Sequence, residues 1–471
     1  MRGGRGDAKS SYLNSPLGGA AGRGQFADCG CARSLDNDFH RFGVCKDVYM
    51  SDHGVYGPST TDSGTDQGSS RRQAWKGWIS GDIQGGAVLL VAALLGFALA
   101  NSPWREGYHS MLETVVGPAS LHLDLSLAEW AADGLLAIFF FVVGLELKHE
   151  FVAGSLRDPR RAGVPVAAAV GGMVVPALIY VAIVATNDPE ALRGWATPTA
   201  TDIAFALAVF AIFGAGLPSA LRVFLMTLAV VDDLLGIIVI ATVYTETIDF
   251  VMLAIGLVCV VAFGFAVRLR RTHWWILAPL GLAAWGFVHA SGVHSTVAGV
   301  LLGFAVPAAL VFDERHPRTE SFAETVAPIS AGIALPLFAF ASAGVTVIGV
   351  GHIVQPVSIG VFCGLVVGKV LGVVVTTFLV TRLTPLRLAE GISVRSLVPV
   401  GLLTGIGFTV ALLIAELSFS DATGLPADHQ PAAKVGILLG SLVAAVLGGA
   451  LLRWDVRHAR VNGEAAVELD D

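Results

Sequence analysis

Two adjacent carboxylates, Asp232 and Asp233, lie in the middle of an apolar run that extends from Val223 to Tyr244. The run is long enough to cross a lipid bilayer as a helix. A charged side chain at the centre of a bilayer costs at least ~2.5 kcal/mol, so two in succession require a polar cavity inside a helix bundle rather than lipid around them. The chain must therefore fold so that its interior holds charge at membrane depth.

The composition is that of an integral membrane protein. Of the 471 residues, 54% are hydrophobic and 14% are charged, and the mean hydropathy is +0.70. A hydrocarbon core roughly 30 Å thick needs about 20 apolar residues of helix. We therefore predict an all-α polytopic membrane protein with about twelve transmembrane helices. The expected spans are 84–101, 128–147, 162–185, 198–215, 218–244, 250–268, 273–289, 293–312, 325–349, 355–381, 395–418 and 433–452.

The basic residues predict the orientation of these spans. An even number of crossings places both termini on one side, and Lys and Arg concentrate in cytoplasmic loops. If the N-terminus is cytoplasmic, the loops on the opposite side contain only Arg105, Arg193 and Lys434, and most other basic residues face the cytoplasm. We therefore expect both termini in the cytoplasm.

Three regions differ in composition. Residues 1–76 are rich in Gly, Ser, Asp and Arg and contain no apolar run long enough for a signal peptide. We interpret them as a disordered cytoplasmic extension. The membrane domain is expected at residues 77–455, and a short cytoplasmic tail at residues 456–471.

Within the extension, Cys29, Cys31, His40 and Cys45 could in principle supply four zinc ligands. The C-x-C spacing is not the usual spacing of a zinc site, so we expect no resident metal and no cofactor. A translation start at Met50 is an alternative for this region, and the intact mass of the purified protein would test it.

Three further features interrupt the apolar pattern at bilayer depth. Asp202 follows Pro198 and a cluster of threonines, Lys369 lies near the centre of another span, and the glycine-rich segment Gly401–Thr409 lies in the eleventh. Lipid cannot hydrogen-bond backbone groups freed by a break, so such segments must face protein or water. The fourth and eleventh spans are the interrupted ones. The fourth is the middle span of the third to fifth, and the eleventh is the middle span of the tenth to twelfth, a pattern typical of transporters with inverted-topology repeats. We predict discontinuous fourth and eleventh helices.

The charges indicate how such a site would work. Where broken helices cross, Asp202 is suited to offset two positive N-terminal ends, and Lys369 to offset C-terminal ends or to neutralise an aspartate. Successive helical residues point about 100° apart, so one of Asp232 and Asp233 should face an ion path and the other a partner. A carboxylate that binds a cation when ionised releases it when protonated, which is already an exchange mechanism.

Five motifs occur in order along the chain. They are F-F-V-V-G-L-E-L-K (140–148), A-T-D-I-A-F-A-L (200–207), L-A-V-V-D-D-L-L-G-I-I (228–238), P-L-F-A-F-A-S-A-G-V (336–345) and G-I-G-F-T-V (405–410). With the lysine of G-K-V-L-G (368–372), they resemble the NhaA family of sodium/proton antiporters from about Gly81 to Trp454. That family is itself a standard example of inverted-topology repeats.

The resemblance implies a secondary transporter of the bacterial plasma (inner) membrane, not an enzyme. Its members exchange cytoplasmic Na⁺ or Li⁺ for a larger number of external protons, hence electrogenically, under the control of pH and for sodium and pH homeostasis. They commonly form homodimers through extramembrane strands and helix contacts. No nucleic-acid partner is expected.

The resemblance also assigns roles to residues of the site. Asp233 would be the principal ion-binding and proton-carrying carboxylate, and Asp232 its neighbour, implicated in the same step and paired with Lys369. Asp202, with Thr201 beside it, would lie at the crossing of the fourth and eleventh helices.

A second group of residues matches the part of the family that senses pH. Glu146, Lys148 and Glu150 lie at the cytoplasmic end of the second span, and Asp133 matches an acidic residue lower in the same funnel. His149 departs from the family, which more often has arginine there. Because histidine titrates in the physiological range, it could move the pH threshold.

Several of these residues also have a structural interpretation. Lys369 could be a counter-charge that never titrates, since buried ion pairs serve both purposes. Asp202 is expected to act structurally, by compensating helix dipoles. The group around Glu146 could be a charged anchor at a helix end, and His294 is expected to be a hydrogen-bonded packing residue.

Two other classes of membrane protein are alternatives. An intramembrane aspartyl protease brings two aspartates face to face across a water, one of them in a Gly-x-Gly-Asp setting. Here Gly405-Ile406-Gly407 precedes Phe408, and the two aspartates are consecutive on one helix. A passive cation channel tends to use rings of carboxylates from repeated subunits rather than one asymmetric pair with a buried lysine.

Overall fold

The computed structural model describes residues 82–118, 123–245, 247–270, 273–312, 314, 316–347, 354–389, 391–420, 426 and 428–461. The predicted N-terminal extension, its possible zinc ligands and the alternative start at Met50 lie outside these residues. Of the predicted C-terminal tail, residues 456–461 belong to the last helix, α18, and the rest lies outside the described residues.

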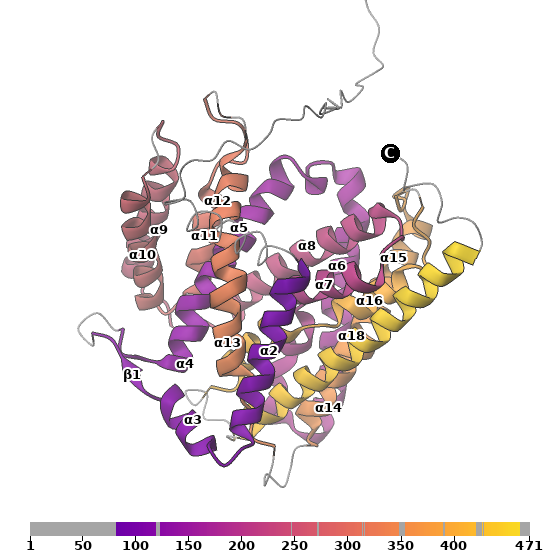
Figure 1. Cartoon of the computed structure of the whole chain (residues 1–471), viewed down its shortest axis with the longest axis horizontal. Coiled ribbons are helices and arrows are strands. Elements are labelled where there is room, and N and C mark those ends of the chain that lie inside the picture. Colours follow the sequence, from indigo (N-terminus) through magenta and orange to yellow (C-terminus); the bar gives the residue numbers. More distant parts are fainter. Residues whose placement is uncertain are drawn as a thin grey trace, which may run out of the picture. The chain divides into compact units, whose positions relative to one another are not determined.

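Helices dominate the described chain (Figure 1). The first half contains α2 (Asp82–Ala100), α3 (Arg105–Leu112), β1 (Val115–Val116), β2 (Leu125–Ser126), α4 (Leu127–Glu129), the π-helical η2 (Trp130–Leu135), α5 (Leu136–Val152), the 3₁₀ turn η3 (Ser155–Arg157), α6 (Pro159–Asn187), the 3₁₀ segment η4 (Pro189–Thr199), α7 (Ile203–Phe213), α8 (Ser219–Val243) and α9 (Phe250–Ala266). The second half contains α10 (Trp274–Ala290), α11 (Thr296–Ala305), α12 (Arg318–Ile329), the π-helical η5 (Ser330–Ala334), α13 (Leu335–Ser342), α14 (Pro356–Cys363), the π-helical η6 (Gly364–Gly368), α15 (Lys369–Leu383), α16 (Leu397–Thr404), α17 (Phe408–Ser418) and α18 (His429–Val461). Strands β1 and β2 pair antiparallel.

Each of the twelve predicted spans contains a helix, but the helices differ in length. Six continuous helical segments in the described chain are long and apolar enough to cross a membrane. If each of three bent helix pairs also forms one span, the number of such segments rises to nine. The remaining predicted spans hold the shorter apolar helices α9, α10 and α11. The multi-pass helical architecture is thus established, whereas twelve crossings stay a prediction.

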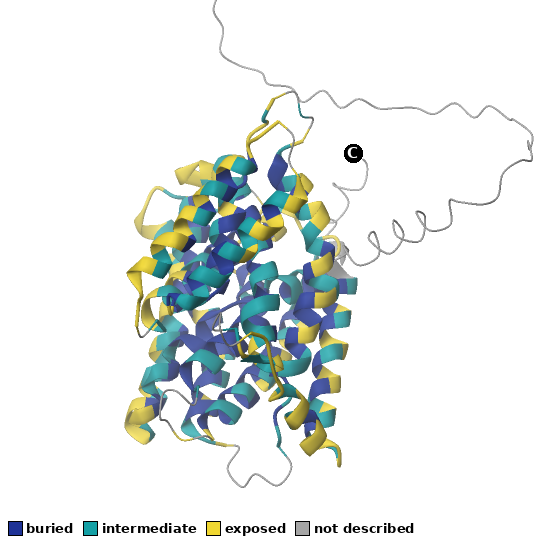
Figure 2. Cartoon of the chain, turned by 90° about the vertical axis from the view of Figure 1, so that its left-hand side faces the viewer, coloured by how far each residue is buried: buried dark blue, intermediate teal, exposed yellow. Residues whose placement is uncertain are grey.

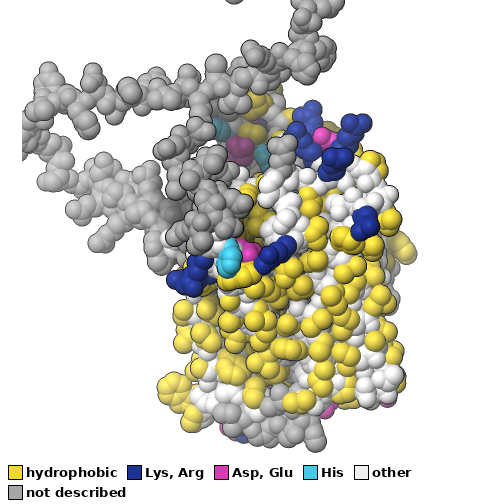
Figure 3. Space-filling model, turned by 90° about the vertical axis from the view of Figure 1, so that its right-hand side faces the viewer, with side chains coloured by type: hydrophobic (Ala, Val, Ile, Leu, Met, Phe, Trp, Pro, Cys, Tyr) yellow, Lys and Arg dark blue, Asp and Glu magenta, His cyan; other side chains and the backbone are white. Residues whose placement is uncertain are grey.

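The outer surface is apolar, as a lipid-facing surface requires. Large hydrophobic side chains point outward along several helices, for example Leu94 (57% exposed), Val258 (66%) and Val446 (61%). Buried residues fill the interior (Figure 2), and Lys and Arg side chains lie above a broad hydrophobic band on the side that carries α18 (Figure 3). In water such a surface would be a strong aggregation liability, so the protein is a multi-pass membrane protein.

Glycines let the helices around the site approach closely. A Cβ added at Gly372 of α15 would lie 2.2 Å from the carbonyl oxygen of Gly171 in α6, and one at Gly303 of α11 would lie 2.2 Å from that of Phe141 in α5. Small residues at helix interfaces are the usual means of tight packing in membranes, where burial from water supplies no driving force between helices. The helix that begins with Lys369 is therefore held against α6.

Two of the bent pairs meet at the centre of the fold. Segment η4 and helix α7 differ in direction by 49° across residues 200–202, and α16 and α17 differ by 43° across residues 405–407. The two breaks touch, because the backbone N–H of Asp202 donates to the carbonyl of Ile406 at 2.6 Å. Pro198 and the glycines of Gly405-Ile406-Gly407 are the local causes of these breaks, since neither residue type favours a continuous helix.

Candidate functional site

Asp202 joins the two broken helices. It is the N-cap of α7, where Oδ1 accepts from the N–H of Phe205 at 3.0 Å. Its Oδ2 accepts from the N–H and the hydroxyl of Thr409, in the first turn of α17, at 3.2 and 2.8 Å. One buried carboxylate thus caps two helix N-termini, where its negative charge is favourable. With both oxygens occupied, Asp202 is suited to a structural role.

Lys369 is completely buried beside the C-terminal end of η4, at the first of the two breaks. Its Nζ donates to Oδ2 of Asp232 at 2.6 Å, to the hydroxyl of Thr201 at 3.0 Å and to the carbonyl of Thr199, the last residue of η4. An ammonium group has three donors, and all three are used. Such a pair persists in a low-dielectric interior only when its hydrogen bonds are satisfied.

Thr201 connects this ion pair to the second break. Its hydroxyl lies 2.7 Å from Oδ2 of Asp232 and 2.9 Å from the carbonyl of Thr404, at the end of α16. A hydroxyl has one proton, so it donates to one of the two at a time. The second oxygen of Asp232, Oδ1, is buried and accepts no hydrogen bond from any described residue.

Asp233 differs from its neighbour in its hydrogen bonding within the described part of the chain. The residue is 2% exposed, and neither carboxylate oxygen has a hydrogen-bond partner among the residues that the structure describes. Burying an ionised carboxylate without compensation is very costly, so the group must be accompanied by a proton or a cation. Together with Oδ1 of Asp232, the pair offers three unsatisfied carboxylate oxygens, the ligand type that hard cations prefer.

A cavity of about 270 Å³ lies near this pair. It lies between α5, α7, α8 and α12, and reaches Val230, three residues before Asp233, and Ile203, next to Asp202. Its polar lining comes from the residues Glu146, His149, Glu150, Thr319 and Glu320. The cavity thus brings polar side chains of α5 and α12 together with residues that lie within one turn of Asp233 and beside Asp202.

The residues assigned to pH sensing occupy different environments. Glu146 lines the cavity with an exposed side chain. Glu150 is 8% exposed, and its Oε2 accepts from the N–H and hydroxyl of Ser155, each at 2.8 Å. His149 lines the cavity with a buried, unpartnered Nδ1. Lys148 points elsewhere, with its Nζ 4.5 Å above the ring of Phe304.

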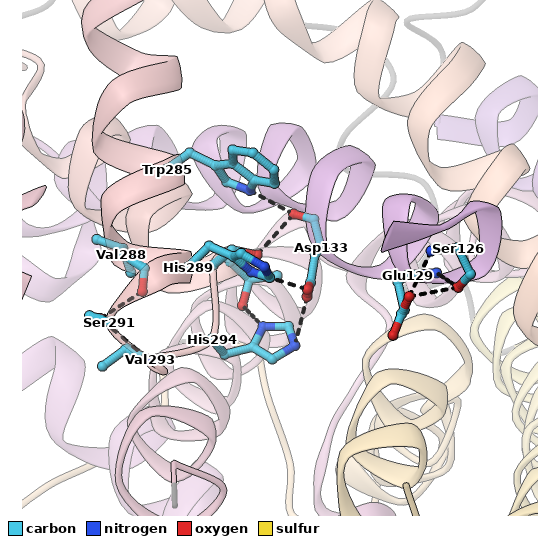
Figure 4. A network of polar contacts seen from close by, with 11 residues as sticks. Ser126, Glu129, Asp133, Trp285, Val288, His289, Ser291, Val293 and His294 are labelled. Carbon is cyan, nitrogen blue, oxygen red and sulfur yellow. Dashed lines mark hydrogen bonds and ion pairs between the residues drawn. The ribbon is translucent and has the colours of Figure 1, made fainter. Parts of the chain in front are cut away.

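The structure places Asp133 apart from this group. It lies in η2, 13 residues before Glu146, or about 20 Å along a helix. Its carboxylate faces two histidines, with Oδ1 3.0 Å from Nε2 of His294 and Oδ2 3.5 Å from Nδ1 of His289 (Figure 4). That Asp133 lies lower in the same funnel as Glu146 stays a prediction.

Sequence reasoning missed residues in both places. His294 was expected to be a hydrogen-bonded packing residue, and it does contact Thr296 at 2.8 Å, but its other nitrogen contacts Asp133. His289 was not considered, although two histidines five residues apart were a visible signal. Glu320 was overlooked because a charge in the first turn of a helix, here α12, is unremarkable in sequence.

Comparisons with known proteins identify the family of this chain. A family described as Na⁺/H⁺ antiporter 1 matches residues 76–452. The chain is 50% identical over 412 residues to a Na⁺/H⁺ antiporter NhaA of Mycolicibacterium smegmatis, covering 85% of this chain and 94% of that protein. It is 53% identical over 390 residues to one of Frankia casuarinae, covering 81% and 87%, and 54% identical over 374 residues to NhaA 2 of Salinispora arenicola, covering 78% and 85%. The chain therefore belongs to the NhaA family of Na⁺/H⁺ antiporters, which are transporters and not enzymes.

Proposed function

We propose that this protein exchanges cytoplasmic Na⁺, or Li⁺, for external protons across the bacterial inner membrane, with Asp233 as the carboxylate that carries either ion. The observation that supports this most directly is the burial of Asp233 without any hydrogen-bond partner for either oxygen. A buried carboxylate of this kind always needs either a proton or a cation. Binding of one therefore displaces the other, which is an exchange. The names of the relatives support Na⁺ and H⁺ as the exchanged ions.

Charge balance supports the involvement of Asp232 and Lys369. With both aspartates ionised and Lys369 charged, the site has a net charge of −1, which one Na⁺ neutralises. Exchange of that Na⁺ for a proton on Asp233 alone would move no net charge. Electrogenic exchange therefore needs a second titrating group, and the Lys369–Asp232 pair, joined at 2.6 Å, is the adjacent one. If Lys369 is only a counter-charge, exchange through this site is electroneutral.

Regulation by pH would act at the cavity lined by Glu146, His149 and Glu150. The cavity lies within one turn of Asp233 on α8, and His149 contributes an imidazole to its lining. We place this end of the bundle in the cytoplasm, with both termini, because the basic residues concentrate there. We place twelve crossings in the domain at residues 77–455, with η4/α7 and α16/α17 as its discontinuous spans. We place a homodimer contact at the paired strands β1 and β2, of which β1 is exposed.

Proton flux in proteoliposomes tests this proposal. The purified protein is reconstituted at fixed internal pH, Na⁺, Li⁺, K⁺ or choline is added outside, and the membrane potential is first clamped and then released. We expect proton movement that depends on Na⁺ or Li⁺ and responds to the potential. Asp233→Asn should abolish it. Asp158→Asn, at the exposed N-cap of α6, is the matched control and should retain it.

Two results would contradict the proposal. Normal sodium-driven proton flux in the Asp233→Asn variant would remove that carboxylate from the mechanism. Sodium uptake without proton counter-movement would instead support a passive cation channel. Thermal unfolding of each variant in detergent shows whether a loss of flux comes from a loss of fold.

A further inference from the structure

A second large cavity lies on the outer side of the helix crossing. It has a volume of about 750 Å³, within the roughly 300–1,000 Å³ range of ligand pockets, and lies between α2, α7, α17 and α18. Its floor is buried and includes Ile406 (1% exposed) and Phe408 (6%). Its rim is exposed and apolar, with Leu90 (41%), Leu94 (57%), Leu442 (60%) and Val446 (61%). On the surface of a membrane protein, such a groove opens to lipid.

One end of this groove carries a single charge. Arg453, on α18, is the one charged residue among those that line it, and it is exposed. It forms no hydrogen bond or ion pair with any residue that the structure describes. A cation at the membrane surface attracts anionic lipid headgroups, at about 1 kcal/mol for each basic residue. The end of the groove is therefore complementary to a phosphate.

The dimensions fit one lipid leaflet. Arg453 is twelve residues beyond Ser441 on α18, which corresponds to about 18 Å of helix. One leaflet contributes about half of the roughly 30 Å hydrocarbon core. An acyl chain whose headgroup lies at Arg453 would therefore reach the level of Ser441, where the groove meets the helix crossing.

From these observations we infer that the groove between α2, α7 and α18 is a binding site for one acyl chain of an anionic phospholipid, with Arg453 holding the headgroup phosphate. A different apolar cavity, separate from this groove, has a volume of about 840 Å³ and lies between α5, α10 and α13. No charged residue is among the described residues that line it. It offers no such headgroup contact and serves as an internal comparison.

An acyl chain in this groove would contact the break between α16 and α17. Ile406 and Phe408 flank Gly407, whose N–H donates to the hydroxyl of Ser441 at 3.2 Å, and the carbonyl of Ile406 accepts from Asp202. The acyl chain would thus pack against the outer side of the unwound segment whose inner side Asp202 caps. Lipid binding itself is independent of whether the protein transports sodium.

Native mass spectrometry of the full-length protein tests the headgroup contact. The protein is titrated with phosphatidylglycerol or with phosphatidylcholine of the same acyl chains. We expect phosphatidylglycerol to bind more tightly, and Arg453→Gln to weaken it about fivefold, the equivalent of about 1 kcal/mol. Arg382→Gln should change nothing, because Arg382, at the end of α15, lies over Phe378 and does not line the groove. Equal binding of both lipids, or equal affinity of the Arg453→Gln variant, would overturn the assignment.

Tryptophan variants and a photoreactive residue test the position of the acyl chain. Ala450→Trp fills the groove from an exposed position and should reduce phosphatidylglycerol binding, whereas Ala278→Trp fills the comparison cavity and should not. A photoreactive benzoylphenylalanine in place of Leu442 should form an adduct with the mass of a phospholipid. An adduct with a peptide of this chain, or with a second copy, would show that protein occupies the groove and would overturn the inference.

Discussion

Replacement of Lys369 by methionine removes the charge that compensates Asp232 while retaining most of the side-chain volume. Lys369 is fully buried, and its ammonium group donates three hydrogen bonds, one of them to Oδ2 of Asp232 at 2.6 Å. After the replacement, Asp232 keeps only the hydroxyl of Thr201 as a donor. Removal of one partner of a buried ion pair typically costs about 3–5 kcal/mol, because the other charge is left uncompensated.

The same reasoning predicts that removal of both charges costs much less. Asp232→Asn in the Lys369→Met background abolishes the uncompensated carboxylate and leaves an amide that can still accept from Thr201. We therefore expect the double variant to recover most of the loss, with a coupling free energy of about 2–3 kcal/mol between the two positions.

Unfolding of the wild type, both single variants and the double variant in mixed micelles measures these free energies. The measurement does not require transport, so it tests the ion pair independently of the proposed function. A Lys369→Met variant as stable as the wild type, or a double variant no more stable than Lys369→Met, would refute the argument from uncompensated charge.

Three other perturbations follow from the structure. Asp202→Asn removes the charge that caps α7 and α17, and should lower the unfolding free energy by about 1–2 kcal/mol; an unchanged unfolding midpoint would contradict dipole compensation. His149→Arg should shift the pH dependence of exchange in proteoliposomes without changing the preference between Na⁺ and Li⁺, so an altered ion preference would count against a sensing role. Gly303→Val places a Cβ 2.2 Å from the carbonyl oxygen of Phe141 and should destabilise the protein by about 1–3 kcal/mol. The same change at Gly286, which has no neighbour within 4 Å of an added Cβ, should cost little, and equal losses in thermal unfolding would refute the packing argument.

The sequence by itself determined the class of protein and the identity of the central charges. Long apolar runs require helices in a membrane, and charged residues inside them require a polar interior. Pro198 and the glycines of Gly405-Ile406-Gly407 marked the two breaks, because proline and glycine act locally on the backbone. The ordered motifs were sufficient to indicate the family. The limits of η4 escaped prediction because its first residues include Pro189, Glu190 and Arg193, a polar run that the apolar pattern excludes.

Only the tertiary structure decided which faces of these helices meet. Helix α7, with the sequence I-A-F-A-L-A-V-F-A-I-F, is apolar all round, so no periodicity marks the side that packs against protein. The contact of Lys369 with Asp232 depends on the packing of two helices, α15 and α8, against α6, and Gly372 and Gly171 allow the close approach of α15.

The contacts of Asp133 also could not be predicted from the sequence. Its resemblance to a residue of the family predicts a role in pH sensing, but only the structure shows that it contacts His289 and His294, more than 150 residues later in the chain. Contacts between residues so distant in sequence depend on how η2, α10 and α11 pack, and the packing of apolar helices in a membrane is decided by close surface complementarity rather than by any local pattern.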